Sequence, residues 1–308
     1  MLFDNIKMPF SSLRLFLAVA IVTLAIPRHG VANNIGRINP LSYLGVGARA
    51  IGLNGAFTAA CTDYTAPIWN AAAMGLFTTV KFGGMQSKMS LNRELMFISV
   101  SVPTEKWGAL ALSWSKFAVN EIEARSNNTL EPDGYFGMQE QTVLVTYAYK
   151  ILPMLSIGSN IKIHHFGLDQ LTAWGIGTDA AIFVVPWEKL RLGIVTEDFG
   201  SVLLWSSGHA EHYERAYRIG CAIYPTSNIV VSCDYRQSQQ GEQRLTFGSE
   251  WLVLNLIKFR CGYDQQRWAF GSGFTLPIKS TFLTFNYAIA ADRMEAGLFD
   301  VFDLSIAF

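Results

Sequence analysis

Few residues of this 308-residue chain have the types and spacing that catalysis or metal binding requires. His209, Glu211 and His212 could ligate zinc, but no further ligand is spaced near them, so we favour a solvated polar loop. His164 and His165 are adjacent, and neighbours in a strand point to opposite faces and cannot share one ion. No Gly-x-Ser-x-Gly turn, phosphate loop or dinucleotide fingerprint occurs. The sequence predicts no enzyme, no metal site, no cofactor and no nucleic-acid partner.

From residue 79 onward, the chain divides into segments of about ten residues with a period of two. Within 256–265, Phe259 and Tyr263 lie on one side, whereas Arg260 and Asp264 lie on the other. Turn residues separate the segments. We predict fourteen strands, the even count expected of a single-chain bacterial outer-membrane barrel. They are 79–87, 94–103, 107–117, 139–150, 154–165, 174–185, 189–197, 214–223, 228–237, 243–252, 256–265, 267–276, 280–290 and 298–308. The gaps 118–138 and 198–213 are predicted to be loops.

Alternation alone fits both a membrane barrel and a soluble β-sandwich, in which the apolar faces meet inside. Aromatic residues near strand ends, such as Trp107, Trp251 and Trp268, favour the barrel because they suit the membrane interfaces. The last strand ends on Phe308, which resembles the signal read by the outer-membrane barrel assembly machinery. We therefore predict an all-β transmembrane antiparallel barrel in contact with lipid, in the bacterial outer membrane.

The polar side of the predicted strands carries many charges. Thirteen charged residues are predicted to face the lumen: Lys162, Asp179, Arg191, Arg218, Asp234, Arg236, Arg244, Glu250, Lys258, Arg260, Asp264, Arg267 and Asp303. They could line a substrate or ion path, or form a salt-bridge lattice, which we favour because such networks are common in buried polar interiors. Eight of the thirteen are basic, which favours an anionic head group if a molecule passes.

The first residues have the features of an export signal. An apolar run from Leu15 to Ile26 follows Lys7 and Arg14 and precedes the small residues before position 33. This pattern is typical of a secretory signal peptide, with a short anchor helix as the alternative. We predict a signal peptide over 1–32, a plug (hatch) over 33–78 and the barrel over 79–308.

The stretch from Gly45 to Leu76 differs from every strand that follows it. It contains Gly45, Gly47, Gly52 and Gly55, is rich in small residues and has no period of two. Such a segment can pack closely against other backbone. Arg49 and Asp63 within it would each need a polar partner if buried. We predict that the segment lies in the lumen as a plug.

This stretch resembles the N-terminal signature of the PorV/PorQ family, which is itself similar to the long-chain fatty-acid transporter (FadL) family. The shared positions that we single out are Gly47, Arg49, Gly52, Gly55, Phe57, Asp63, Trp69 and Asn70. The chain departs from the signature at Asn70-Ala71-Ala72, where the family has Asn-Pro-Ala. The resemblance implies a fourteen-stranded barrel with a lumenal hatch. It also implies either passage of hydrophobic molecules or a place in type IX protein secretion.

The four cysteines follow no metal-ligand spacing. If the hairpin turns about Thr226, Cys221 faces position 231 and Cys233 faces position 219. The two thiols would then be one diagonal step apart on the lipid side, which argues against a bridge.

Two functions follow from these features. The first is passive transport of hydrophobic or amphipathic small molecules through a barrel opened by movement of the plug. The second is a PorV/PorQ-type component or adaptor that binds proteins of a type IX secretion machine. Because most predicted loops are short, the sequence offers little docking surface and favours transport.

Overall fold

The structure is a computed structural model that describes residues 39–104, 106–293 and 296–308. These residues belong to one compact unit, Gly36–Phe308. The predicted signal peptide lies outside the described residues. No helix in the described ranges is long and apolar enough to cross a membrane.

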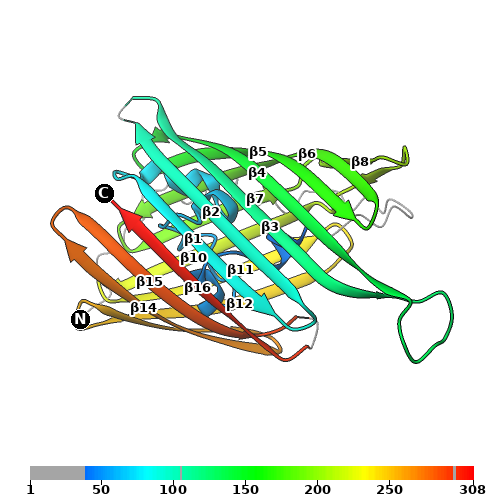
Figure 1. Cartoon of the computed structure of the whole chain (residues 1–308). Coiled ribbons are helices and arrows are strands. Elements are labelled where there is room, and N and C mark those ends of the chain that lie inside the picture. The colour runs from blue at the N-terminus through cyan, green and yellow to red at the C-terminus, as the bar shows by residue number, and fades with distance from the viewer. Residues whose placement is uncertain (1–38, 105, 294–295) are drawn as a thin grey trace. The chain divides into compact units, whose positions relative to one another are not determined.

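Short helical elements precede a long series of strands (Figure 1). The helical elements are α2 (Pro40–Leu44), α3 (Ala48–Gly52), α4 (Ala66–Trp69) and the 3-10 helix η1 (Ala71–Leu76). The strands are β1 (Lys81–Met89), β2 (Arg93–Thr104), β3 (Gly108–Ala124), β4 (Gly134–Leu152), β5 (Leu155–Leu168), β6 (Leu171–Trp187), β7 (Leu190–Glu197), β8 (Val202–Trp205), β9 (Ala210–His212), β10 (Ala216–Thr226), β11 (Ile229–Ser238), β12 (Gln243–Val253), β13 (Ile257–Asp264), β14 (Arg267–Ile278), β15 (Thr281–Ala291) and β16 (Leu298–Ala307).

In the described part of the chain, fourteen strands form one closed antiparallel barrel. Consecutive strands pair from β1 to β7 and from β10 to β16, and β7 pairs with β10. The ring closes where β1 pairs with β16, for example Met85 opposite Asp303 (Figure 1). The predicted fourteen-stranded barrel is therefore confirmed. Phe308 exchanges two backbone hydrogen bonds with Val80 beside this closing pair, and its side chain is exposed.

The two predicted loops contain strand structure, and this part of the prediction is wrong. The pairing of β3 and β4 continues through most of 118–138, past a register shift between Val119 and Ile122. Within 198–213, β8 and β9 form a hairpin, and β8 pairs with β6 beyond the point where β7 ends. Asp198, with a φ of 54°, and Gly200, with a φ of 69°, turn the chain between β7 and β8. Such positive φ values interrupt a strand.

The two faces of the barrel differ as the alternation predicts. On β13, Phe259 is 50% exposed whereas its neighbour Arg260 is 2% exposed. The same holds on β15 and β16, where Phe285 and Phe302 point outward while Asp303 is buried. An apolar outer face with a charged inner face is the reverse of a soluble sandwich and suits a barrel surrounded by lipid.

Residues 39–77, the N-terminal segment, fold locally through caps and glycine turns. The Asn39 side chain accepts a hydrogen bond from the Leu41 amide, and Pro40 begins α2, where the missing N–H costs nothing. Gly47 precedes α3 with a φ of 87°. Asn70 lies between α4 and η1, and its side chain accepts from the Ala72 amide.

The N-terminal segment packs on the inner face of the barrel. α3 contacts β13 to β16, whereas η1 contacts β2 to β6, so the segment touches strands far apart around the ring. The N-terminal segment and the wall approach each other closely because glycines lie at their points of contact. A Cβ added to Gly262 of β13 would lie 2.2 Å from the carbonyl carbon of Leu53, and one added to Gly52 would lie 3.1 Å from the Cα of Gly271.

Candidate functional site

Arg49 carries a buried ion-pair network between the N-terminal segment and the barrel wall. Its guanidinium donates to both carboxylate oxygens of Glu250 on β12, each at 2.9 Å. It also donates to Thr62 at 2.8 Å and to Asp63 at 3.4 Å. Glu250 accepts a further hydrogen bond from Arg260 at 2.6 Å. Desolvation alone would lower the pKa of Arg49, but the carboxylates of Glu250 and Asp63 raise it above its usual value, so Arg49 is cationic.

Two carboxylates of the wall hold the backbone of the N-terminal segment. Asp303 of β16 accepts a hydrogen bond from the Ala48 amide at 2.6 Å. Asp234 of β11 accepts from the amides of Phe57 and Thr58, at 3.2 and 2.8 Å. None of these three backbone amides donates a hydrogen bond within a helix, so the carboxylates provide acceptors for buried N–H groups. Each carboxylate also joins the N-terminal segment to one strand of the wall.

Trp69 and Asn70 make contacts within the segment as well as to the wall. The Trp69 indole donates to the Val46 carbonyl at 2.8 Å and packs edge-on against Phe57. The Asn70 amide donates to the carbonyls of Thr58 and Ile182, both at 3.2 Å. Because Ile182 belongs to β6, Asn70 connects the segment to the side of the barrel opposite the strands that bind α3.

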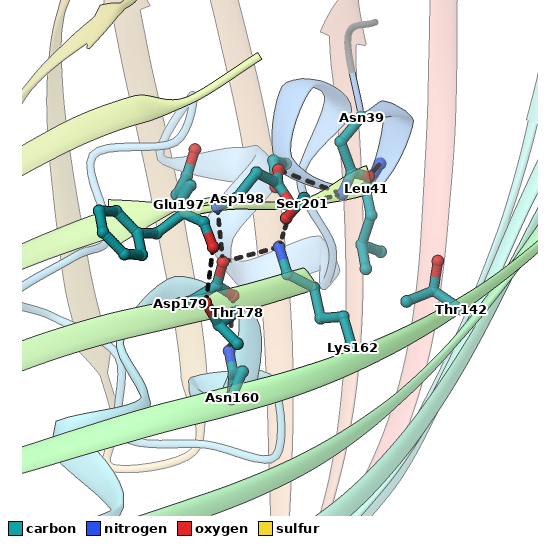
Figure 2. A network of polar contacts seen from close by, with 12 residues as sticks. Asn39, Leu41, Thr142, Asn160, Lys162, Thr178, Asp179, Glu197, Asp198 and Ser201 are labelled. Atoms are coloured by element: carbon teal, nitrogen blue, oxygen red, sulfur yellow. Dashed lines mark hydrogen bonds and ion pairs between the residues drawn. The ribbon is translucent and has the colours of Figure 1, made fainter. Parts of the chain in front are cut away.

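A second buried network surrounds Lys162 at the break between β7 and β8, as Figure 2 shows. The Lys162 ammonium lies 2.7 Å from Asp179 and 2.5 Å from Asp198. Asn160 donates to Asp179 at 2.8 Å and to the carbonyl of Pro67 at 2.7 Å. The Asn39 side chain reaches Asp198 at 3.3 Å (Figure 2). One cation and several donors thus stabilise two buried carboxylates, and Asn39 and Pro67 of the N-terminal segment take part.

Arginines of β10 to β12 and of the turn after β15 surround a narrow pocket beside α2. Its free volume is about 30 Å³. The lining residues that concern us are Tyr43, Trp69, Arg218, Asp234, Arg236, Arg244 and Arg293. Arg244 and Arg293 both lie over the Tyr43 ring, with 5.0 and 5.8 Å to its centroid, and Arg218 lies over Trp69 at 4.7 Å.

The pocket contains more cationic than anionic groups. Arg218 and Arg236 share Glu197, and Arg244 pairs with Glu242 at 2.7 Å. Arg293 pairs with Asp264 at 3.2 Å, and the same carboxylate lies 3.6 Å from Arg267. Arg218 is 3% exposed, and within the described ranges its Nη1 has no hydrogen-bond partner. Burial, and then the neighbouring Arg244, lower the pKa of Arg293 below its usual value.

The remaining residues predicted to face the lumen are placed separately. Arg191 lies over the ring of Tyr224, with 4.3 Å to its centroid, and Lys258 is half-buried on β13. Asp198, Glu197 and Arg293 were not found from the sequence, because they lie between predicted strands or at a strand end. Asn39 could have been found as a helix cap before Pro40.

The structure also places His164 and His165, which were predicted to lie on opposite faces of a strand, and the loop that contains His209 and His212. His164 is fully buried and contacts Thr142 at 2.9 Å, whereas His165 packs on Trp174 on the other side of the strand. Glu211 accepts from the Trp205 indole at 3.1 Å within the β8–β9 hairpin. Among the described residues, no group of three or more His, Cys, Asp or Glu is placed to hold a metal ion.

A closed fourteen-stranded barrel with a helical N-terminal segment bound to its charged inner face defines the structural class of this chain. No family model matches the chain, and no curated protein matches its sequence. The monoaromatic hydrocarbon channel CymD has a similar structure, with a TM-score of 0.64, 14% identity and coverage of 88% of this chain and 98% of CymD.

Two further solved structures share this fold. The Pseudomonas putida toluene transporter TodX matches with a TM-score of 0.62, 11% identity, and coverage of 89% of this chain and 99% of TodX. A Pseudomonas aeruginosa FadL homologue matches with a TM-score of 0.56, 11% identity and the same coverage. At these identities the similarity concerns the fold. It confirms the barrel fold that the resemblance to the FadL family implies, whereas membership of the PorV/PorQ family stays a prediction.

Proposed function

We propose that this protein is an outer-membrane barrel that admits hydrophobic or amphipathic small molecules passively, with the N-terminal segment as its movable plug. The apolar outer face supports a place in lipid. The three barrels of similar fold are described as a hydrocarbon channel, a toluene transporter and a FadL homologue, which supports transport of apolar molecules.

The observation that carries the proposal is how the N-terminal segment is held. It contacts strands around much of the ring, yet polar contacts from a small set of side chains, among them Asp303, Asp234 and Asn70, fix its backbone. The free volume beside α2 is about 30 Å³, which is room for about two or three water molecules. A hydrocarbon-sized molecule that enters this pocket therefore requires the segment to move, and the contacts of Asp303, Asp234 and Asn70 oppose that movement.

The arginine pocket favours amphipathic molecules with an anionic head group. Arg244 and Arg293 crowd one aromatic ring, and Arg218 has a buried donor without a partner among the described residues. A carboxylate placed among them would accept charge-assisted hydrogen bonds and relieve the repulsion between guanidinium groups. A neutral hydrocarbon would gain neither effect.

The test is uptake of radiolabelled dodecanoate and radiolabelled toluene by cells that express the protein. We expect expressing cells to take up both faster than cells without the protein. Asn70→Ala removes three hydrogen bonds of the plug and should change uptake several-fold, whereas Asn228→Ala, in an exposed turn, should leave it unchanged. Uptake equal to that of non-expressing cells would contradict the proposal.

The type IX alternative remains a prediction of the sequence resemblance. Secretion of surface proteins, measured in the same strains, separates the two functions. A secretion defect on deletion, with unchanged uptake of both labelled molecules, would favour an adaptor over a transporter. The barrel would then serve as an anchor for partner proteins.

A further inference from the structure

Cys221 of β10 and Cys233 of β11 are directly opposite each other in the barrel wall. Both are partly exposed, on the outer face that also presents Ile219 and Val231. Residues directly opposite in an antiparallel pair have Cα atoms about 4.5–5.5 Å apart, which falls within the range of about 4.4–6.8 Å that disulfides span. Both cysteines are free thiols in the structure. Strand pairing brings them within reach of each other, and a bond requires their Cβ atoms to move from the about 4.5–5.5 Å of an opposite pair to the about 3.5–4.5 Å of a disulfide.

The diagonal arrangement predicted from the sequence is wrong because the chain turns at residues 227–228, between Thr226 and Ile229, and not at Thr226. A one-residue shift of the pairing lies between Ile223 and Thr226, and Cys221 is opposite residue 233 rather than residue 231. The predicted and observed registers differ by two residues, and a shift of two keeps every side chain on its own face. Apolar burial alone thus discriminates weakly between the two registers, whereas a Cys221–Cys233 bond is compatible only with the observed one.

The other cysteines have no such neighbour. Cys61 is buried in the N-terminal segment, where its thiol lies 3.4 Å from the carbonyl oxygen of Thr58. Cys261 of β13 lies opposite Ser249 on one side and Phe270 on the other. Among the described cysteines, strand pairing therefore places only Cys221 and Cys233 opposite each other.

We propose that Cys221 and Cys233 form a disulfide when the chain is exported, and that this bond fixes the register of the β10–β11 hairpin. The oxidant is a protein disulfide of a thiol oxidoreductase, of the class that keeps the periplasm oxidising. One cysteine thiolate attacks a sulfur of that disulfide, which releases the first thiol of the oxidant and forms a mixed disulfide. The second thiolate attacks the sulfur of the first cysteine and displaces the second thiol of the oxidant. Two electrons pass to the oxidant, and the two protons lost by the cysteines are taken up by its two thiols.

The register matters because the opposite face of this hairpin carries site residues. Arg218 lies opposite Arg236, and Gly220 lies opposite Asp234, the carboxylate that holds Phe57 and Thr58 of the plug. A slip of two residues would move Asp234 along the strand by about 7 Å, at 3.4 Å per residue. The cross-link would hold both arginines and the plug contact in their places.

The experiment determines the state of each thiol in the full-length protein from outer membranes. Cells are lysed in denaturant with N-ethylmaleimide, and the unreduced protein is digested and analysed by mass spectrometry. We expect one peptide pair linked through Cys221 and Cys233, with Cys61 and Cys261 carrying the maleimide. In a strain that lacks its periplasmic thiol oxidase, the linked fraction should fall several-fold.

Matched variants make the result specific. Cys221→Ser should leave Cys233 alkylated, whereas Cys261→Ser should leave the linked peptide unchanged. Alkylation of both Cys221 and Cys233 in the wild-type protein from cells would overturn the proposal, as would a link from either to another cysteine. The wild-type measurement decides the question even where a variant fails to assemble.

Discussion

Arg49 and Glu250 form a two-point ion pair inside the barrel, although 201 positions separate them in the chain. The pair joins the N-terminal segment to β12, and Arg260 holds the same carboxylate from β13. All three side chains are largely buried. The position of the segment therefore depends on charges that have few alternative partners.

Replacing Arg49 should destabilise the protein strongly. Arg49→Gln leaves Asp63 without its cation and Glu250 with one guanidinium instead of two, and breaking a buried pair costs about 3–5 kcal/mol. The measurement is urea unfolding in detergent micelles. Arg125→Gln is the matched control, because its pair with Glu123 is exposed, and such pairs contribute about 0–1 kcal/mol. Equal stability of the two variants would contradict the interpretation.

Replacing Gly262 should displace the N-terminal segment. The methyl group of Gly262→Ala would meet the Leu53 backbone at 2.2 Å, and backbone cannot rotate away. We expect a loss of about 1–3 kcal/mol, typical of overpacking, and faster proteolysis of residues 39–77. Gly134→Ala is the control, since no atom lies within 4 Å of its new methyl group. A Gly262 variant as resistant as the control would show that the segment is not tightly packed there.

The arginine pocket should distinguish anionic from neutral molecules. The double variant Arg244→Gln/Arg293→Gln should reduce dodecanoate uptake about tenfold, the effect of one charge-assisted contact of about 1.4 kcal/mol. Toluene uptake should stay within twofold of wild type. Lys279→Gln removes an exposed cation from a turn and serves as the control. If uptake of dodecanoate and uptake of toluene fell equally, the substitutions would have damaged the barrel rather than a site for the anionic head group.

Lys162 should be required to stabilise the buried carboxylates of Asp179 and Asp198 in the folded protein. Lys162→Met places Asp179 and Asp198 together without a cation, and we expect a loss of about 3–5 kcal/mol in unfolding free energy. Adding Asp198→Asn to that variant should restore part of the loss, because one of the unpaired charges is removed. Lys106→Met, at an exposed turn, should have little effect. No recovery in the double variant would contradict this account.

Cys61 should be protected from thiol reagents over a wide pH range. Burial, and then the nearby carboxylates of Asp63 and Asp234, raise the pKa of its thiol above the usual value. The thiol therefore stays protonated at pH 8 to 9, where an exposed cysteine with a pKa of about 8.5 ionises and reacts. With the other cysteines replaced by serine, maleimide labelling should be slow at every such pH until urea unfolds the protein. Asn127→Cys, in an exposed loop, should label at once and faster as pH rises.

Much of the wall could be predicted from the sequence, because a period of two places Phe259 outward and Arg260 inward whatever strands surround them. The partner of Arg49 could not, since five of the thirteen charged residues are carboxylates that competed for it and only the closed ring brings Glu250 to it. The register at Cys221 was missed because the chain turns at residues 227–228 rather than at Thr226, and the two-residue difference in register leaves the alternation of faces unchanged. Asp198 was missed because a residue that ends a strand has no periodic pattern to mark it.

The bond from the Ala48 amide to Asp303 has a consequence for biogenesis. Ala48 is among the first of the described residues to leave the ribosome, and Asp303 is among the last. Their contact cannot form until β16 has been synthesised. The N-terminal segment, although it is made before every strand, therefore reaches its final position only at the end of assembly.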